Sequence, residues 1–149
     1  MDMNHIIENK DKVNSKYLMG ITYYNRGDIY FNWNMFEEAL EELKAGVKFM
    51  PKNLFCYYLK ANVELELKYY EQALKDINRA IKLREDFGLF HIIKGHILSE
   101  MHGDEKIFQK YMLIAKTLID DEMEDHLDTE DGMFDNEDYI PDVQTEQCN

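Results

Sequence analysis

The chain has 149 residues, of which 45% are hydrophobic and 13% aromatic, with only two prolines and seven glycines. The length favours a single domain, and the scarcity of proline and glycine favours helices over a turn-rich β architecture. No run approaches the roughly 18 uninterrupted apolar residues that a membrane span needs. The first residues lack the basic start and apolar run of a secretory signal, so we expect a soluble, cytoplasmic protein.

The net charge of −13 lies entirely at the C-terminal end. Residues 1–119 contain all 17 Lys and Arg and 17 of the 30 acids, whereas residues 120–149 contain the other 13 acids and no base. A neutral body without a basic stripe argues against nucleic-acid binding. Cys56 and Cys148 stand far apart, in neither a disulfide nor a metal-binding pattern, so we expect plain thiols.

The first predicted elements are two helices that follow an N-terminal helical extension or cap at residues 1–19. Residues 20–53 predict a helix, a break near Trp33–Asn34 and a second helix that Pro51 stops. Asn34 and Glu37 have the spacing of a capping box, which would begin the second helix.

The next elements repeat the first pair with a period of 34 residues, over 54–87 and 88–121. Breaks are predicted near Lys68–Tyr69 and His102–Gly103. Small residues recur in register, because Gly27, Ala61 and Gly95 are one period apart. A glycine inside a helix costs about 1 kcal/mol relative to alanine, so Gly27 and Gly95 indicate close helix crossings.

The repeat resembles the tetratricopeptide repeat, a helix–turn–helix unit of 34 residues. The first unit has the family's small residue at Gly27, aromatic at Tyr30, alanine at Ala39, small residue at Gly46 and proline at Pro51. The resemblance implies an all-α fold, an α-solenoid of three such repeats, in which stacked neighbours bury one another's apolar faces. Residues 122–149 are then expected to form an acidic, largely disordered tail.

The resemblance also places the first helix of each unit on a concave side that binds a partner. The outward positions of these helices are mostly aromatic, aliphatic, amide or acidic, with no lysine or arginine. A groove of this kind suits a peptide or helix with apolar anchors and a positive charge, with Tyr24 and Tyr58 as the main anchors. The candidate groove residues are Ile21, Tyr24, Asp28, Phe31, Phe55, Tyr58, Asn62, Leu65, Leu89, Ile92 and His96.

One binding mode of the family is not expected here. Members that hold chaperone tails clamp a carboxylate with lysine, arginine and asparagine. The matching positions in this chain are Tyr24, Asp28, Leu59, Leu89 and Ile93. None of these side chains can clamp a carboxylate, and Asp28 would repel it.

No enzyme, cofactor or metal site is expected. No P-loop, nucleophile elbow or zinc-protease motif occurs, and the histidines at 91, 96 and 102 do not share a helical face. The most direct prediction is a non-catalytic adaptor or small chaperone that binds a protein partner, with neither membrane nor nucleic acid involved. Pairing of two chains into a homodimer stays open.

The acidic end leaves a second function open. It interleaves apolar residues with acids, in a pattern typical of a short linear motif for a partner or for the chain's own groove. It would also attract basic proteins such as histones or ribosomal proteins, which defines the alternative of an acidic-tail chaperone. The candidate motif residues are Met133, Phe134, Tyr139 and Ile140.

Overall fold

The computed structural model describes residues 3–130, and every regular element in that part of the chain is a helix. Side-chain surroundings are described for residues 8–123. The predicted all-α class is therefore confirmed. The helices are α1 (Met3–Asn32), α2 (Phe36–Phe49), α3 (Leu54–Glu66), α4 (Tyr70–Leu83), α5 (Gly88–His102) and α6 (Glu105–Glu130).

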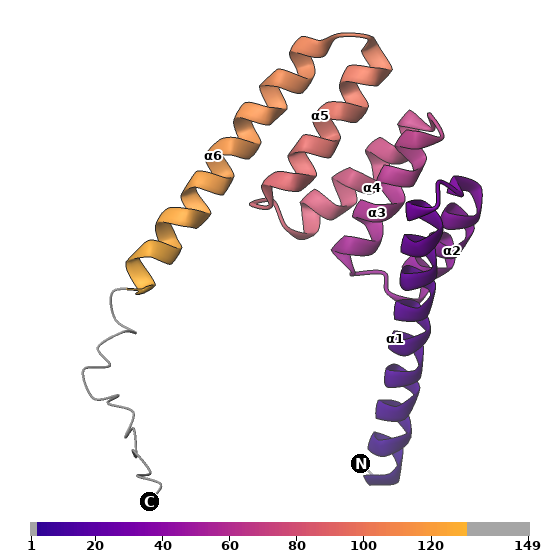
Figure 1. Cartoon of the computed structure of the whole chain (residues 1–149). Coiled ribbons are helices and arrows are strands. Elements are labelled where there is room, and N and C mark those ends of the chain that lie inside the picture. The colour runs from indigo at the N-terminus through magenta and orange to yellow at the C-terminus, as the bar shows by residue number, and fades with distance from the viewer. Residues whose placement is uncertain (1–2, 131–149) are drawn as a thin grey trace, which may run out of the picture.

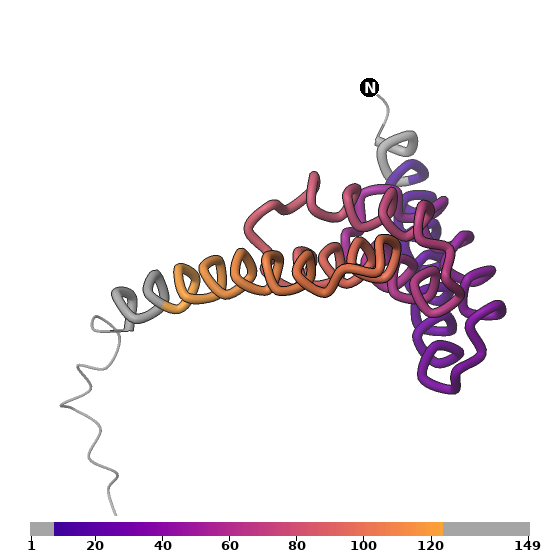
Figure 2. Tube along the Cα trace, turned by 90° about the horizontal axis from the view of Figure 1, so that it is seen from above, coloured from indigo at the N-terminus to yellow at the C-terminus, as the bar shows by residue number. Residues whose placement is uncertain are grey.

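The six helices form three antiparallel hairpins that stack in a row (Figure 1). The hairpins are α1 with α2, α3 with α4, and α5 with α6, and they join where α2 packs on α3 and α4 packs on α5. Figure 2 shows the stack after a quarter turn, with α6 projecting from the last hairpin. This is the solenoid of three helix–turn–helix units that the repeat predicts. No described helix is long and apolar enough to span a bilayer.

A residue in the left-handed conformation reverses the chain inside each hairpin. The φ angles are 59° at Asn34, 61° at Lys68 and 65° at Gly103. In all three turns the amide of the following residue donates to a carbonyl five residues earlier in the chain. These bonds run from Met35 to Tyr30 (2.9 Å), from Tyr69 to Glu64 (2.8 Å) and from Asp104 to Ser99 (3.2 Å). These bonds satisfy carbonyls that the end of a helix leaves without partners. The turns lie where the sequence predicts breaks.

The predicted capping box at Asn34 and Glu37 is wrong. The N-cap of α2 is Met35, and no side chain caps this helix end. A capping side chain belongs to a residue with extended backbone, whereas Asn34 is left-handed, a conformation that asparagine tolerates. Asn34 therefore ends α1 instead of beginning α2. Asn53 does cap its helix, because its Oδ1 accepts from the amide of Cys56 at 3.0 Å.

Glycines allow the two helices of a hairpin to cross closely, as predicted. A Cβ on Gly27 would lie 2.8 Å from Cγ of Leu43, and a Cβ on Gly95 would overlap Tyr111. The second hairpin achieves its crossing with alanines that are fully buried, among them Ala61 and Ala73. Two apolar clusters fill the space between hairpins, and the largest fully buried side chains are Phe90, Leu43, Ile77 and Ile97.

Both end helices are longer than the repeat requires. α1 continues without a break from Met3 through the expected N-terminal extension. α6 continues to Glu130, so the boundary expected between residues 121 and 122 lies inside a helix. Residues 131–149, with the predicted tail motif Met133, Phe134, Tyr139 and Ile140, lie outside the described residues.

Candidate protein-binding groove

The first helices of the three hairpins line one side of the stack. α3 contacts both α1 and α5, whereas the second helices α2, α4 and α6 make no such contacts with one another in the described part of the chain. Helices that approach one another in this way lie on the inner side of a curved array. The side formed by α1, α3 and α5 is therefore the concave one, and we call it the groove.

Ten of the eleven candidate groove residues have surface that a partner can touch. Phe55, Leu89 and His96 are exposed, and seven others are half-buried. Leu65 is an exception, because only 8% of it is exposed and it belongs to the core with Ala61 and Ile97. The prediction that Leu65 contacts a partner is wrong, since the next hairpin covers this position.

Tyr24 and Tyr58 lie close together on α1 and α3. Burial raises the pKa of Tyr24, and the charge of Asp28 and the proximity of Tyr58 raise it further. The phenol therefore stays neutral and can donate a hydrogen bond. The ring of Tyr58 lies 5.6 Å from that of Phe90, centroid to centroid. This contact holds Tyr58 in place, and Tyr24 is held in the same way by packing against the cluster that contains Leu59 and Val63.

Polar groups in the groove add acceptors and acids. The Nδ2 atom of Asn62 donates to its own helix, at the carbonyl of Tyr58, over 2.9 Å, which leaves its Oδ1 for a partner. His96 lies 3.8 Å from the carboxylate of Glu100. No candidate groove position carries lysine or arginine, so the charge of Asp28 and Glu100 disfavours an acidic partner and favours a basic one.

Sequence reasoning missed a buried charged cluster in the second hairpin. Nζ of Lys60 on α3 lies 2.5 Å from Oδ2 of Asp76 on α4 and 3.2 Å from Oε1 of Glu64. Glu64 is only 2% exposed, and its Oε2 has no hydrogen-bond partner. The cluster is too buried to touch a peptide, so it is not part of the groove. Its ion pair between Lys60 and Asp76 links α3 to α4.

The cluster holds a proton on Glu64. Burial raises the pKa of Glu64 to about 8, hydrogen bonding to Asp76 and the charge of Asp76 raise it further, and Lys60 partly opposes the shift. Burial lowers the pKa of Lys60, but its bond to Asp76 and the charge of Glu64 outweigh this, so the net shift is upward. Near neutral pH the cluster therefore contains a charged lysine and a largely protonated Glu64.

The period of the repeat was the signal that would have revealed this cluster. Arg26 and Glu42 stand one period before Lys60 and Asp76, and they form the same link between the two helices of their hairpin at 2.6 Å. The third hairpin differs, because the residue one period after Asp76 is Lys110, a base instead of an acid. A base on the first helix and an acid on the second thus pair in two hairpins of three.

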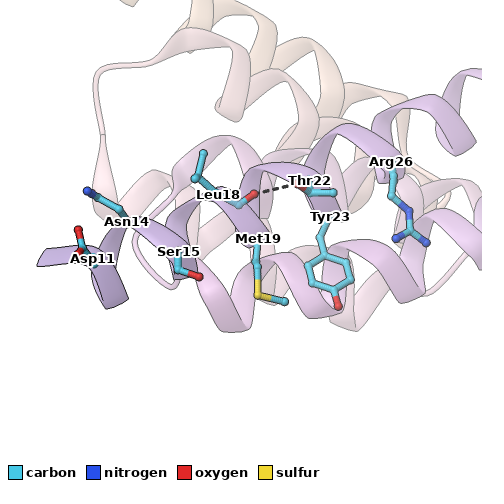
Figure 3. A pocket seen from close by; sticks show the side chains of 8 residues that line it. All are labelled: Asp11, Asn14, Ser15, Leu18, Met19, Thr22, Tyr23 and Arg26. Atoms are coloured by element: carbon cyan, nitrogen blue, oxygen red, sulfur yellow. Dashed lines mark hydrogen bonds between the residues drawn. The ribbon is translucent and has the colours of Figure 1, made fainter. Parts of the chain in front are cut away.

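A second hollow lies on α1, away from the candidate groove residues (Figure 3). It has a volume of about 510 Å³, and all its lining residues come from this one helix. The hydroxyl of Thr22 donates to the carbonyl of Leu18 at 2.9 Å, and Arg26 is paired with Glu42. Because no second element faces it, this hollow is an open helix surface. Among residues 8–123, whose side-chain surroundings are described, no group of three or more His, Cys, Asp or Glu could hold a metal ion.

The sequence of the first two hairpins matches a known family. The family model described as tetratricopeptide repeat matches residues 21–53 and 56–87. The chain is a tetratricopeptide-repeat protein. The two matches cover the repeated part of α1, α2, most of α3, and α4.

Curated relatives of this tetratricopeptide-repeat protein are much longer. The chain is 29% identical over 70 residues to the Hsp70-Hsp90 organising protein of Plasmodium falciparum (isolate 3D7), which is 47% of the chain and 12% of that protein. It is 36% identical over 61 residues to DnaJ homolog subfamily C member 3 of Rattus norvegicus, which is 41% of the chain and 12% of that protein. The similarity thus spans about an eighth of each relative.

Solved structures support the fold. The first tetratricopeptide-repeat domain of Spaghetti (RPAP3), bound to the HSP90 peptide SRMEEVD, superimposes with a TM-score of 0.62 and 19% identity. The match covers 68% of this chain and 79% of that one. At this identity the similarity shows the shared architecture alone.

Proposed function

We propose that this chain is a non-catalytic adaptor or small chaperone whose groove holds an extended or helical segment of a partner protein. The observation that carries the proposal is the row of exposed and half-buried apolar and aromatic residues on α1, α3 and α5, which includes Tyr24 and Tyr58 and contains no lysine or arginine. Aromatic side chains held by their neighbours give large contact areas at a low cost in conformational entropy. Asp28 and Glu100 favour a partner with a basic residue beside its apolar anchors.

Similarity to co-chaperone proteins supports a peptide as the partner. The residues of this chain do not support the lysine, arginine and asparagine clamp that holds the C-terminal carboxylate of a chaperone. In the Spaghetti (RPAP3) structure, a domain of this architecture binds the peptide SRMEEVD. Here the positions of the clamp carry Tyr24, Asp28, Leu59, Leu89 and Ile93, and Leu59 is buried. We therefore expect the groove to select apolar and basic side chains within a peptide instead of an acidic C-terminus.

Peptide selection against the purified chain tests this proposal. A random peptide library is selected on the wild-type chain, and the enriched peptides are titrated by fluorescence anisotropy at two salt concentrations. Apolar anchors with nearby Lys or Arg are expected. Tyr24→Ala should weaken binding about tenfold or more, which is typical of a central aromatic anchor. Tyr69 is exposed in the turn between α3 and α4, outside the groove positions, so Tyr69→Ala is the matched control and should bind normally.

Two results would contradict the proposal. The first is enrichment of peptides that lose binding when their C-terminal carboxylate is amidated, with SRMEEVD as a reference peptide. The second is equal binding by Tyr24→Ala and the wild type. Binding of basic peptides that disappears at physiological salt and ignores Tyr24 would instead support the acidic C-terminal end as the binding element.

A further inference from the structure

The last hairpin leaves an apolar surface uncovered. In the first two hairpins, the first helix of the next unit covers the second helix, α3 on α2 and α5 on α4. No described helix covers α6 in this way. Between α5 and α6 lies a hollow of about 570 Å³, lined by Ile92 of α5 and by Phe108, Met112, Leu113 and Ile119 of α6. We call this hollow the end slot.

The repeat shows what the end slot is shaped to receive. One period before Phe108 and Ala115 stand Leu74 and Ile81, which pack on the cluster that contains Phe90 of α5. On α6, Phe108 is half-buried, and beside it Met112 is 41% and Leu113 65% exposed. The positions one period before Met112 and Leu113 are Asn78 and Arg79, which are polar and exposed, so an exposed apolar pair at these positions is peculiar to α6. An apolar segment that lies along α6 would bury this surface.

A second copy stacked head to tail does not supply such a segment. The helix that covers α2 packs on it through Cys56, Leu59 and Val63. The same positions of α1, one period earlier, are Thr22, Asn25 and Ile29. Two of these three side chains are polar, so α1 of another copy lacks the apolar row that the end slot would need.

The chain itself continues beyond α6 with suitable residues. Residues 131–149 contain two apolar pairs, Met133–Phe134 and Tyr139–Ile140. Met112 lies 18 residues before Glu130, which is about 27 Å along the helix. An extended segment advances about 3.3 Å per residue, so about eight or nine residues that run back along α6 bring Tyr139 to the level of Met112.

The same register matches the remaining residues. Because the segment runs back along α6, Met133 and Phe134 would lie about 12 Å back from the end of the helix at Glu130. That is the level of Met123, which is 61% exposed. Between the two apolar pairs, Glu137 and Asp138 would pass near Lys116, which lines the end slot. In this register Glu137 and Asp138 lie beside the first half of α6, which is basic. Met133 and Phe134 lie beside its second half, which is acidic.

We propose that residues 133–142 of this same chain dock into the end slot, extended and antiparallel to α6. The segment is tethered close to its site, and a short tether gives an effective concentration in the millimolar range. A second copy at micromolar concentration cannot compete with that. The end slot shares Ile92 with the groove, but Tyr24 and Tyr58 lie outside it. The tests below therefore rest on α6 and the C-terminal segment, and their failure is distinguishable from a failure of the groove around Tyr24.

Limited proteolysis of the full-length chain is the first test. Chymotrypsin cleaves after Phe134 and Tyr139, and docking protects both bonds in proportion to the occupied fraction. Met112→Asp should expel the segment and raise both cleavage rates at least about fivefold, as expected when four-fifths or more of the wild-type chains are docked. Thr117→Asp adds the same charge at an exposed position of α6 outside the lining and should leave both rates unchanged. Equal cleavage of all three chains would overturn the proposal.

Methyl NMR of the full-length chain separates the possible occupants. With Tyr139→Asp/Ile140→Asp, the methyl resonances of Met112 and Ile119 should shift, whereas Thr145→Asp should leave them in place. These resonances should also be independent of protein concentration from about 10 to 200 μM, because the contact is intramolecular. Resonances that move with concentration would show a second copy in the slot, and resonances that ignore both tail variants would show an open slot. Either result refutes the docking.

Discussion

Replacement of Glu64 by glutamine should make the protein more stable at alkaline pH and leave its stability nearly unchanged at acidic pH. Glutamine has nearly the shape of the protonated carboxyl group and cannot lose a proton. Its oxygen can accept from Lys60, as Oε1 of Glu64 does, and its amide can donate to Asp76, the carboxylate that raises the pKa of Glu64. The variant therefore keeps the arrangement of the cluster without its dependence on pH.

The sign and size of the effect follow from the pKa of Glu64. That pKa is raised from 4.5 to about 8 in the folded chain, so the folded state binds the proton more tightly than the unfolded state. The resulting stability is complete below about pH 4.5 and is lost as the pH rises through about 8. At about 1.4 kcal/mol per pKa unit, the full shift corresponds to about 5 kcal/mol. Because a charged Glu64 can recover part of this by rearranging toward water, we predict a difference of at least about 2 kcal/mol at pH 8.5.

Urea unfolding followed by circular dichroism measures this difference at pH values from 5 to 8.5. The free energy of unfolding of Glu64→Gln minus that of the wild type should grow from less than about 1 kcal/mol at pH 5 to at least about 2 kcal/mol at pH 8.5. Taking the difference removes the contribution of the five histidines. Glu66→Gln, at an exposed position of the same helix, is the matched control and should show no such trend. A difference that stays constant over this range would refute the assignment of a proton to Glu64.

Three further predictions concern stability and reactivity. Gly95→Ala should lower the free energy of unfolding by about 1–3 kcal/mol, because the overlap of the new methyl group with Tyr111 outweighs the better helix propensity of alanine. Urea unfolding measures the change, and a variant more stable than the wild type would contradict the close crossing. Lys60→Met should cost about 3–5 kcal/mol, because it leaves the buried carboxylate of Asp76 without its cation. Arg26→Met, at a half-exposed pair, should cost less than about 1 kcal/mol, and equal costs in the same assay would be inconsistent with a buried cluster. Burial raises the pKa of the Cys56 thiol to about 11, so in a Cys148→Ser background this thiol should react with a disulfide reagent at pH 8 only after unfolding, and fast reaction of the folded chain would contradict its burial.

The period of the sequence predicted the fold because the repeat constrains local structure and packing together. Gly27 and Gly95 indicated crossings that the structure contains, and the three breaks appear as turns. Residue preferences were less informative where two local roles compete. Asn34 suits both a helix start and a left-handed turn, and the turn prevails because it satisfies the carbonyls at the end of α1.

The candidate site was predictable only as a face. Helical periodicity shows which residues share the inner side of α3, but it does not show how far the next hairpin covers them, so Leu65 was placed in the groove although it is buried. The cluster of Lys60, Glu64 and Asp76 was missed for a different reason. Charged residues in a helix are usually solvated, and only contact between the helices shows that these three are enclosed.

The central claim is that the groove formed by α1, α3 and α5 binds the partner. Amide NMR of the full-length chain, titrated with a selected peptide, tests this claim most directly. The account predicts that the largest shifts occur at and around Tyr24, Tyr58 and Ile92, and that the shifts saturate with one peptide per chain. Shifts concentrated on α2 and α4, or absent from the first helices, would contradict it.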